Sequence, residues 1–370
     1  MLVAQSTEQI TKQFLDSMYL ISHSDKTITT YKTALNHFKK FLELQYSCNE
    51  SDIIEEIKSE KTNVYTVVQD FIIYLDQKHI RPRGIHSYLS GLKGFLRYTG
   101  IKINSDDFKH AVKIPKVRKT REIPLTKEMI LRVMRNSSPK LQTAILVCTS
   151  SGLRIGELVQ LKLSDIDFKS NPTKINIRAE IAKGSMSRET FITTEATCAL
   201  QDYLKRYFEW MENESNLHLQ ETMIFGRISE VKTGNTPEFS LDSAKQILQL
   251  SLHKQIENIP ELNLKNENGI SAIHFHALRK YFRTTLGNAC GRDYAEALMG
   301  HSFYMDTYYQ LPEEKKKQMY LDAEAQLTLS DFKAVEKNLK VLTAKNTHLE
   351  EKFNDLLSYL RTKSIEVPNL

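Results

Sequence analysis

The sequence predicts a mainly α-helical protein with a small β-hairpin or sheet: a helical bundle, an α+β domain and a C-terminal coiled-coil helix. Three observations predict this arrangement. In roughly the first 105 positions, apolar residues recur only at helical spacing. Two segments in the middle of the chain alternate apolar and polar residues, and the C-terminal segment carries a heptad pattern of apolar residues. The 370 residues also exceed one ordinary domain of about 100–150 residues.

The first 108 residues are expected to form one helical domain of four helices. Thr27 is the predicted N-cap of the second helix, and Arg81-Pro82-Arg83-Gly84 is the predicted turn before the fourth. A basic linker with little helical periodicity is expected at residues 109–124. The apolar helical spacing covers residues 14–21, 31–42, 64–75 and 85–98.

Positive charge concentrates around the fourth helix and the linker. The whole chain carries +6, but residues 77–121 hold twelve Lys and Arg against two Asp, which leaves −4 for the remainder. Lys and Arg side chains often do no more than solvate the exposed face of a helix. Here, however, aromatic and small residues alternate with the basic ones, as expected of a helix that packs one side on the core and turns the other toward phosphates. The predicted nucleic-acid contacts are Arg81, Arg83, Lys93, Arg97, Lys116, Arg118, Lys119 and Arg121.

Residues 125–327 are expected to form a mixed domain. Thr126 is a predicted N-cap, and a buried helix is expected to end at Ser151-Gly152. Two alternating segments predict a hairpin with Lys183 in its turn. The predicted strands are Lys174–Ile181 and Glu189–Thr193, followed by helices at Glu195–Met211 and Ser240–Ile256 and a loop at Asn258–Gly269.

The last segment, residues 328–364, carries the heptad pattern. Asn346 falls on an a position, where a buried Asn favours two strands in one register, and Lys345 and Glu350 place opposite charges at g and e. A long helix packed on its own protein is the alternative to the predicted parallel coiled coil. The apolar seam contains Phe332, Val335, Leu339, Leu342, Leu349, Phe353, Leu356 and Leu360.

Composition excludes several classes of protein. Hydrophobic residues make up 41% of the chain and charged residues 26%, a balance typical of globular proteins. No apolar run approaches the ~20 residues that span a bilayer, the N-terminus lacks a secretory leader, and the four cysteines form no Cys-x-x-Cys pair. We therefore expect a cytoplasmic protein without a disulfide framework or membrane partner.

A first motif, T-S-S-G-L-R-I-G-E-L, is suited to binding an anion. Gly152 lets the chain turn after the buried helix, so Arg154 lies at the start of the next helix, where free backbone amides favour an anion. Glu157, one turn further on, is placed to hold the Arg154 guanidinium. Alone, an arginine at a helix start is a weak signal.

Two further motifs follow. H-F-H-A-L-R-K-Y-F-R places His276 and Arg279 on one helix face, and L-M-G-H, ending at His301, precedes Tyr308 and Tyr309. The alternative interpretation of the first of these motifs is that His274 and His276 bind a metal ion, but no further ligand lies at suitable spacing.

Together and in this order, these motifs resemble those of the tyrosine recombinases, the integrase family of site-specific DNA recombinases. The resemblance covers about residues 11–309, and the tail is most similar to archaeal integrases. It implies a core-binding domain and a catalytic domain that clamp double-stranded DNA. It also implies DNA cleavage and rejoining through a 3′-phosphotyrosyl intermediate, with no metal, ATP or other cofactor.

The resemblance also implies a role for each site residue. Arg154 and Arg279 grip the scissile phosphate, with Glu157 supporting the first arginine, because planar guanidiniums offer paired donors to a phosphate. Lys183 corresponds to the family's hairpin lysine, and His276 and His301 to its two histidine positions.

The resemblance leaves two candidates for the nucleophile. In many members the tyrosine lies nine positions after the Gly-His histidine, and Gln310, which cannot attack, holds that position here. A shorter connection like that of archaeal integrases favours Tyr308, with Tyr309 as the alternative.

Two other functions share these residues: a type IB-like topoisomerase, which works as a monomer, and a catalytically inactive DNA-binding protein of the same fold. The recombinase interpretation implies a dimer on each site and a tetramer in the synapse. It also implies that the helix Glu313–Leu327 docks on a neighbouring catalytic domain.

Overall fold

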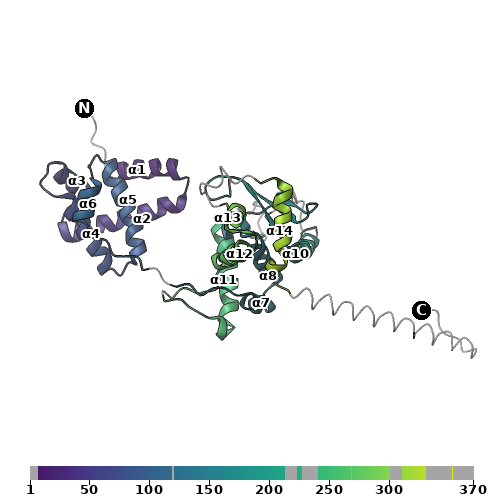
Figure 1. Ribbon diagram of the computed structural model, residues 1–370. Coiled ribbons are helices and arrows are strands. Elements are labelled where there is room, and N and C mark those ends of the chain that lie inside the picture. The colour runs from purple at the N-terminus through teal and green to yellow at the C-terminus, as the bar shows by residue number, and fades with distance from the viewer. Residues whose placement is uncertain are drawn as a thin grey trace, which may run out of the picture. The chain divides into compact units, whose positions relative to one another are not determined.

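The computed structural model describes residues 7–118, 121–212, 223–226, 241–267, 269–300 and 311–330, together with Lys352. The chain divides into two compact units, Met1–Lys119 and Thr120–Leu370, drawn in Figure 1. Apart from a small three-stranded sheet, the regular structure of the described residues is helical, which confirms the mainly α prediction. The heptad segment beyond residue 330 lies outside the described residues, apart from Lys352.

Residues 7–118 of the first unit form six α-helices rather than the four predicted. The two unpredicted helices, α3 and α6, have only nine and seven residues, too few to show a clear apolar period. Because α6 is helical to Ala111 and Val112 is buried in this unit's core, the connection between the units is shorter than the expected 109–124. The helices are α1 (Thr7–Ser22), α2 (Asp25–Phe41), α3 (Glu50–Lys58), α4 (Val64–Gln77), α5 (Pro82–Tyr98) and α6 (Ser105–Ala111), with a π-helical segment η1 (Leu42–Tyr46) after α2.

The predicted N-cap of α2 is wrong by three residues. Ser24 is the cap, and its hydroxyl accepts a hydrogen bond from the backbone N–H of Thr27. Ser24 has the extended backbone that an N-cap requires, whereas Thr27 already lies in the first helical turn.

Aromatic side chains build the core of the first unit. Phe38 and Phe71 meet edge to face with ring centroids 5.3 Å apart, and Phe14 and Phe95 meet in the same way at 5.6 Å. Helices α2 and α5 pack closely at Gly91 of α5, where a Cβ would lie only 2.9 Å from the ring of Tyr31 of α2. This packing buries one side of α5 and leaves its polar side facing solvent.

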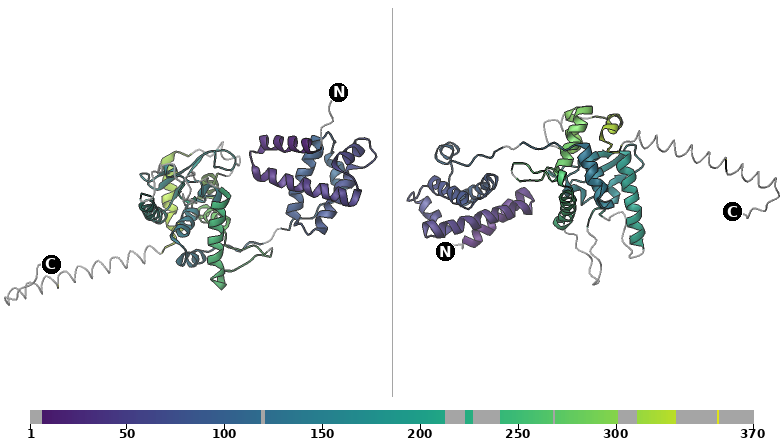
Figure 2. Two further views of the ribbon diagram at one scale, coloured as in Figure 1. Left: turned by 180° about the vertical axis from the view of Figure 1, so that it is seen from behind. Right: turned by 90° about the horizontal axis from the view of Figure 1, so that it is seen from below.

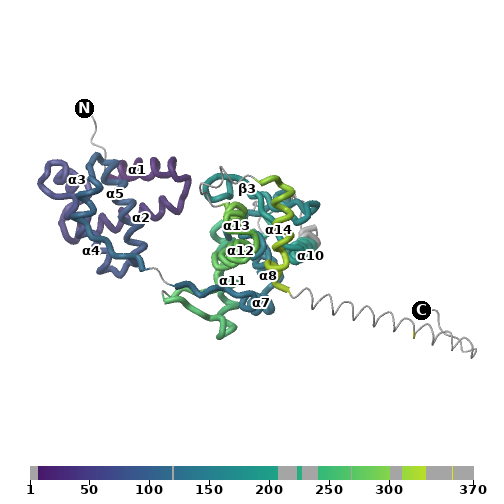
Figure 3. Tube along the Cα trace, viewed as in Figure 1, coloured from purple at the N-terminus to yellow at the C-terminus, as the bar shows by residue number. Residues whose placement is uncertain are grey.

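The second unit is arranged around the buried helix α8 (Pro139–Ser151), against which α10 (Thr194–Glu212) and α12 (Phe275–Cys290) pack, as Figure 3 shows. Thr126 caps α7 (Lys127–Arg135) as predicted, and α8 ends at Gly152 in the left-handed conformation, also as predicted. The other helices are α9 (Ile155–Leu158), α11 (Leu241–Glu257), α13 (Arg292–Met299) and α14 (Glu313–Leu327), with 3-10 turns η2 (Leu163–Asp165) and η4 (Pro260–Leu262).

The predicted hairpin is present as β2 (Thr173–Ile177) and β3 (Arg188–Ile192), which pair antiparallel with Ile175 opposite Thr190. The first strand ends at Ile177 rather than Ile181, because the chain turns after it. A third strand, β1 (Ile166–Asp167), pairs with β2 and was not predicted, since two residues carry no alternation pattern.

The helix α14, expected to dock on a neighbouring catalytic domain, packs on its own unit. Tyr320, Ala323 and Leu327 of α14 are buried in their own unit against Phe191 and Phe282, and Figure 2 shows the helix from two further sides. The Tyr320 hydroxyl donates to the carbonyl of Ser150 at 2.6 Å. The apolar face of α14 is therefore already covered by the chain that carries it.

Within the described part of the chain, no helix is both long and apolar enough to cross a membrane.

Candidate active site

The first motif forms a tight turn that presents Arg154. Gly152 has a φ of 66°, and a Cβ there would lie 2.4 Å from the ring of Phe282, so only glycine fits. Arg154 is the N-cap of α9, and its backbone N–H donates to Glu157 Oε2 at 2.8 Å. Arg154 Nη1 also donates to Glu157 Oε1 at 2.9 Å. Glu157 therefore holds both the backbone and the guanidinium of Arg154, as the spacing predicts.

Arg279 connects the loops of the first and third motifs. It is 1% exposed, with Nη1 donating to the carbonyl of Gly152 and Nη2 to the carbonyl of Met299 at 2.8 Å. Burial, and then the charge of Arg154, lowers the pKa of Arg279 to about 9. Both terminal nitrogens of this guanidinium are thus bonded to backbone carbonyls of the two turns.

Arg188, at the start of β3, was not predicted as a site residue. Its Nη2 lies 2.6 Å from Glu157 Oε2 and its Nη1 3.1 Å from Oε1, so Glu157 is shared between Arg154 and Arg188. The sequence offers only a weak signal for this residue, a basic side chain at the first position of a half-buried strand.

The site has an excess of positive charge. Burial by itself raises the pKa of Glu157, but the hydrogen bonds and charge of Arg188, and then those of Arg154, outweigh it and lower that pKa. Glu157 is thus a carboxylate at neutral pH, facing three guanidiniums that include Arg279. One negative charge among three positive ones leaves a net attraction for an anion.

His276 lies on the exposed side of α12. Burial, and then the charge of Lys280, lowers the pKa of His276, so the imidazole is mostly neutral near pH 7. Lys280 is in turn ion-paired with Glu122. Among the described residues, no three His, Cys, Asp or Glu side chains gather as a metal ion would require.

Lys183 lies in the turn between β2 and β3, exposed to solvent. The next two residues, Gly184 and Ser185, have φ of 102° and 54° in the left-handed region, so the turn is sharp. His301, Tyr308 and Tyr309, the remaining predicted site residues, lie outside the described residues.

The predicted DNA contacts in the first unit differ in exposure. Arg81, the N-cap of α5, Arg83 in its first turn and Arg97 in its last turn are exposed. Lys93 is half-buried, with its ammonium 4.0 Å from the ring centroid of Phe108, and burial lowers its pKa. Lys93 is therefore occupied by an intramolecular cation–π contact.

The basic segment between the units starts beside α5. A ring nitrogen of His86 on α5 lies 3.1 Å from the carbonyl oxygen of Pro115. Lys116 and Arg118 follow this contact and are exposed, as is Arg121. Lys119 lies outside the described residues.

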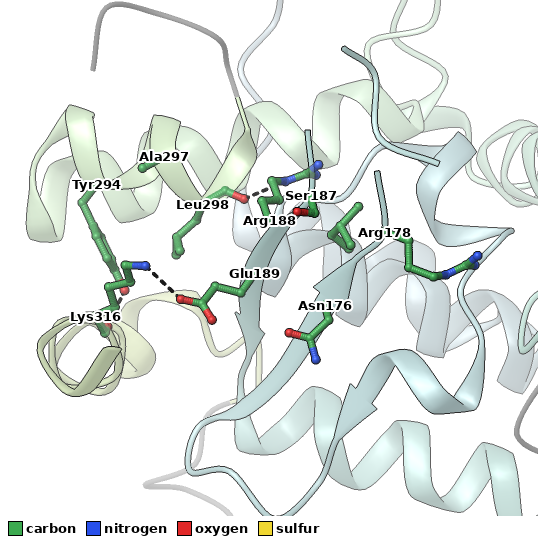
Figure 4. A pocket seen from close by; sticks show the side chains of 10 residues that line it. Asn176, Arg178, Ser187, Arg188, Glu189, Tyr294, Ala297, Leu298 and Lys316 are labelled. Atoms are coloured by element: carbon green, nitrogen blue, oxygen red, sulfur yellow. Dashed lines mark hydrogen bonds and ion pairs between the residues drawn. The ribbon is translucent and has the colours of Figure 1, made fainter. Parts of the chain in front are cut away.

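A cavity of about 540 Å³ lies between the hairpin, α13 and α14, beside the arginine cluster. Figure 4 shows Arg188 and Glu189 pointing from β3 toward Leu298 and Lys316. Lys316 Nζ donates to Glu189 Oε1 at 2.9 Å, which ties α14 to the hairpin.

The chain matches two protein-family models. The model of the phage integrase family matches residues 124–309, half of the chain, and that of the phage integrase SAM-like domain matches residues 9–102. Tyrosine recombinase XerC of Staphylococcus aureus strain N315 is 23% identical over 314 residues, which cover 81% of this chain and 91% of that protein.

Two solved structures share the fold. A lambda integrase dimer bound to a COC′ core site has a TM-score of 0.55 at 13% identity, covering 86% of this chain and 78% of that chain. The XerH site-specific recombinase bound to a palindromic difH substrate has a TM-score of 0.51 at 16% identity, covering 85% and 84%.

Proposed function

Since the chain belongs to the phage integrase family of site-specific tyrosine recombinases, which break and rejoin DNA, we propose that Arg154 and Arg279 bind the scissile phosphate. One observation carries this proposal. Arg279 holds the carbonyls of Gly152 and Met299, so a single buried side chain joins the turn before Arg154 to the turn before His301. Residues from three distant motifs are thereby arranged around one positively charged site.

In the proposed reaction, the phenol oxygen of Tyr308, or alternatively Tyr309, attacks the phosphorus. A bond forms between this oxygen and phosphorus, the bond to the 5′-oxygen breaks, and the phosphate remains on the 3′ end as a phosphotyrosine. The 5′-hydroxyl of another strand then attacks and releases the tyrosine. Each step exchanges one ester for another, so the chemistry needs no input of energy from ATP.

We assign the proton transfers to His276 and Lys183. His276 is exposed and mostly neutral near pH 7, as a base for the tyrosine proton must be. Lys183 is the proposed acid for the leaving 5′-oxygen, and its place in an exposed turn allows it to reach that oxygen. The guanidiniums stabilise the charge that develops on the nonbridging oxygens.

We propose that DNA also contacts the exposed basic residues of α5 and of the segment that follows the first unit. Arg83 and Arg97 lie on the polar side of α5, and Lys116 and Arg118 follow the Pro115 contact. Lys93 is not included, because its ammonium lies over Phe108. Contacts of this kind position a protein on the phosphate backbone without reading sequence.

Covalent capture tests the proposed activity. The full chain is incubated with nicked DNA duplexes of random sequence, denatured, and the attached DNA is sequenced. The wild type is expected to yield a covalent adduct on a defined sequence, and Tyr308→Phe to yield none. Tyr309→Phe is the matched control, since it removes the neighbouring phenol only.

The outcomes separate the alternatives. An adduct that persists in Tyr308→Phe but disappears in Tyr309→Phe moves the nucleophile by one residue. A wild type that binds DNA without any adduct supports the inactive DNA-binding protein instead. Relaxation of supercoiled DNA by a monomer, without strand exchange, supports the topoisomerase.

We also propose that the protein assembles as a dimer on each site and as a tetramer in the synapse. Lambda integrase is found as a dimer on a core site and as a tetramer on a Holliday junction, which supports this assembly. The heptad seam at 332–360 is the proposed coiled coil, with Asn346 setting its register. Truncation after Ser330 is expected to lower the mass measured by light scattering while cleavage is retained. An unchanged mass contradicts the coiled coil.

A further inference from the structure

Arg188 makes contacts on both sides of the site. Its side chain is 9% exposed, and its two terminal nitrogens donate hydrogen bonds to the two carboxylate oxygens of Glu157 at 2.6 and 3.1 Å. Its third donor, Nε, reaches the carbonyl of Leu298 at 3.1 Å, as Figure 4 shows. Paired contacts of this kind use the planar fork of an arginine, which a lysine cannot reproduce.

The turn at the end of α13 fits closely around Arg188. Gly300 has a φ of 64°, and a Cβ there would lie 2.5 Å from Arg188 Cδ and 2.9 Å from its Nε. A glycine is therefore required by the backbone conformation and by the arginine beside it. Gly300 immediately precedes His301 and the segment that carries both candidate tyrosines.

Two arginines hold successive carbonyls of this turn. Arg188 binds the carbonyl of Leu298, and Arg279 binds that of Met299. Arg188 also binds Glu157, and Glu157 holds Arg154. Arg188 is thus linked in one step to the turn before His301 and in two steps to the proposed phosphate-binding arginine.

From these contacts we propose that Arg188 is a positioning residue for the recombination reaction, holding Arg154 through Glu157 and fixing the turn at Leu298–Gly300. This inference rests on the proposed function, because it assigns Arg188 to the same phosphate site. Arg188 acts through Glu157 and Leu298 and is not itself assigned to the phosphate.

Arg178 offers a matched control on the same hairpin. Its Nε contacts both oxygens of the buried Asp165 at 2.9 and 3.2 Å, and its Nη2 donates to the carbonyl of Gln160 at 2.9 Å. Arg178→Gln therefore removes the same kind of buried ion pair and carbonyl contact, without a link to Arg154 or Gly300.

The experiment measures single-turnover adduct formation by the full chain on a nicked duplex of the sequence recovered by covalent capture. Arg188→Gln is expected to slow this step about 100-fold, the effect of misplacing reacting groups by roughly 1 Å. Arg178→Gln is expected to slow it far less. Affinity for the duplex, measured by gel shift, is expected to change little in both variants.

The pH profile separates positioning from loss of stability. The charged groups facing Glu157 are Arg154 of α9, Arg188 of β3 and Arg279 of α12, with the Cys148 thiol of α8 also near. Removing Arg188 removes the largest interactions that lower the pKa of Glu157, so Glu157 takes up its proton at higher pH. The acid side of the Arg188→Gln rate profile is therefore expected to move to higher pH, with no such movement in Arg178→Gln.

Two more variants complete the test. On a Glu157→Gln background, Arg188→Gln is expected to have a much smaller effect, because the two residues act as one unit. Arg188→Lys keeps a positive charge, so it is expected to restore the pH profile yet remain slower than the wild type.

Three results overturn the proposal. The first is equal slowing by Arg188→Gln and Arg178→Gln, the second is an Arg188→Gln effect unchanged in the Glu157→Gln background, and the third is a wild-type rate in Arg188→Lys. If Arg188→Gln does not fold, the Arg188→Lys rate alone decides. A wild type without any adduct overturns the proposed function and this inference together, whereas an adduct with equal slowing overturns only the inference.

Discussion

The two units of this protein differ in what they bury. Among residues 7–118, the buried side chains are hydrophobic, with phenylalanines at the centre. The second unit instead buries Glu157, Asp165 and Arg279 along with several serines and threonines. A buried charge is costly unless it is paired, and here Glu157 is paired with Arg154 and Arg188 and Asp165 with Arg178, which fixes the arrangement of these charged groups. The first unit keeps its charges on the surface, where they suit a phosphate backbone.

The largest expected effect is a cavity in the first unit. Phe71→Ala is expected to lower the free energy of unfolding by about 3–5 kcal/mol, because Phe71 is 0% exposed and contacts two other phenylalanine rings. Urea unfolding followed by circular dichroism measures the loss. Trp210, the chain's single tryptophan, lies on α10 of the second unit, and its fluorescence transition is expected to stay unchanged.

Ile73, on the same helix and 44% exposed, provides the control. Ile73→Ala is expected to change the free energy of unfolding far less than Phe71→Ala. If Phe71→Ala also shifts the Trp210 transition, the two cores are not independent.

A second prediction concerns acid. The pKa of Glu157 is lowered in the folded chain, so its contribution to stability is present above the unfolded value of about 4.3 and is lost as pH falls through the folded pKa. Hydrogen bonds to a charged group typically contribute about 1.5–3 kcal/mol, which sets the expected size. The Trp210 transition should therefore move to lower urea concentration between pH 6 and pH 3.

Glu157→Gln provides the control for this acid effect, because it cannot titrate and should flatten the pH dependence of the second unit. In the first unit, Glu50 should have the opposite effect on the pH dependence of stability, because burial raises its pKa. The folded form of Glu50 binds a proton more readily than the unfolded form, so acid stabilises it. Equal loss of stability in both units on acidification contradicts the comparison.

The smallest predicted effect tests the packing of α14 on its own unit. Tyr320→Phe removes only the hydroxyl that donates to the carbonyl of Ser150, and is expected to cost about 1 kcal/mol in the Trp210 transition. Tyr98→Phe, at a position that is 45% exposed in the first unit, should leave that transition unchanged. An unchanged transition in Tyr320→Phe indicates that α14 is released from its unit in solution.

Local pattern was sufficient for most of the fold and for the contact between Arg154 and Glu157. Helical spacing predicted the long helices, Thr126 and Gly152 were correctly predicted as helix ends, and the three-residue spacing of Arg154 and Glu157 predicted their contact. These features depend on neighbours within one or two turns, so the sequence carries them directly. The short helices α3 and α6 and the strand β1 were missed because so few residues show no period.

The sequence by itself determined the long helices, the hairpin and the order of the three motifs. Only the tertiary structure decided that Arg188 binds Glu157, 31 positions away, and the carbonyl of Leu298, 110 positions away. It also decided that α14 packs on its own unit, with Tyr320 bonded to a carbonyl 170 positions earlier. Contacts at such separations depend on how whole elements pack, and a periodic pattern records which face is buried but not what covers it.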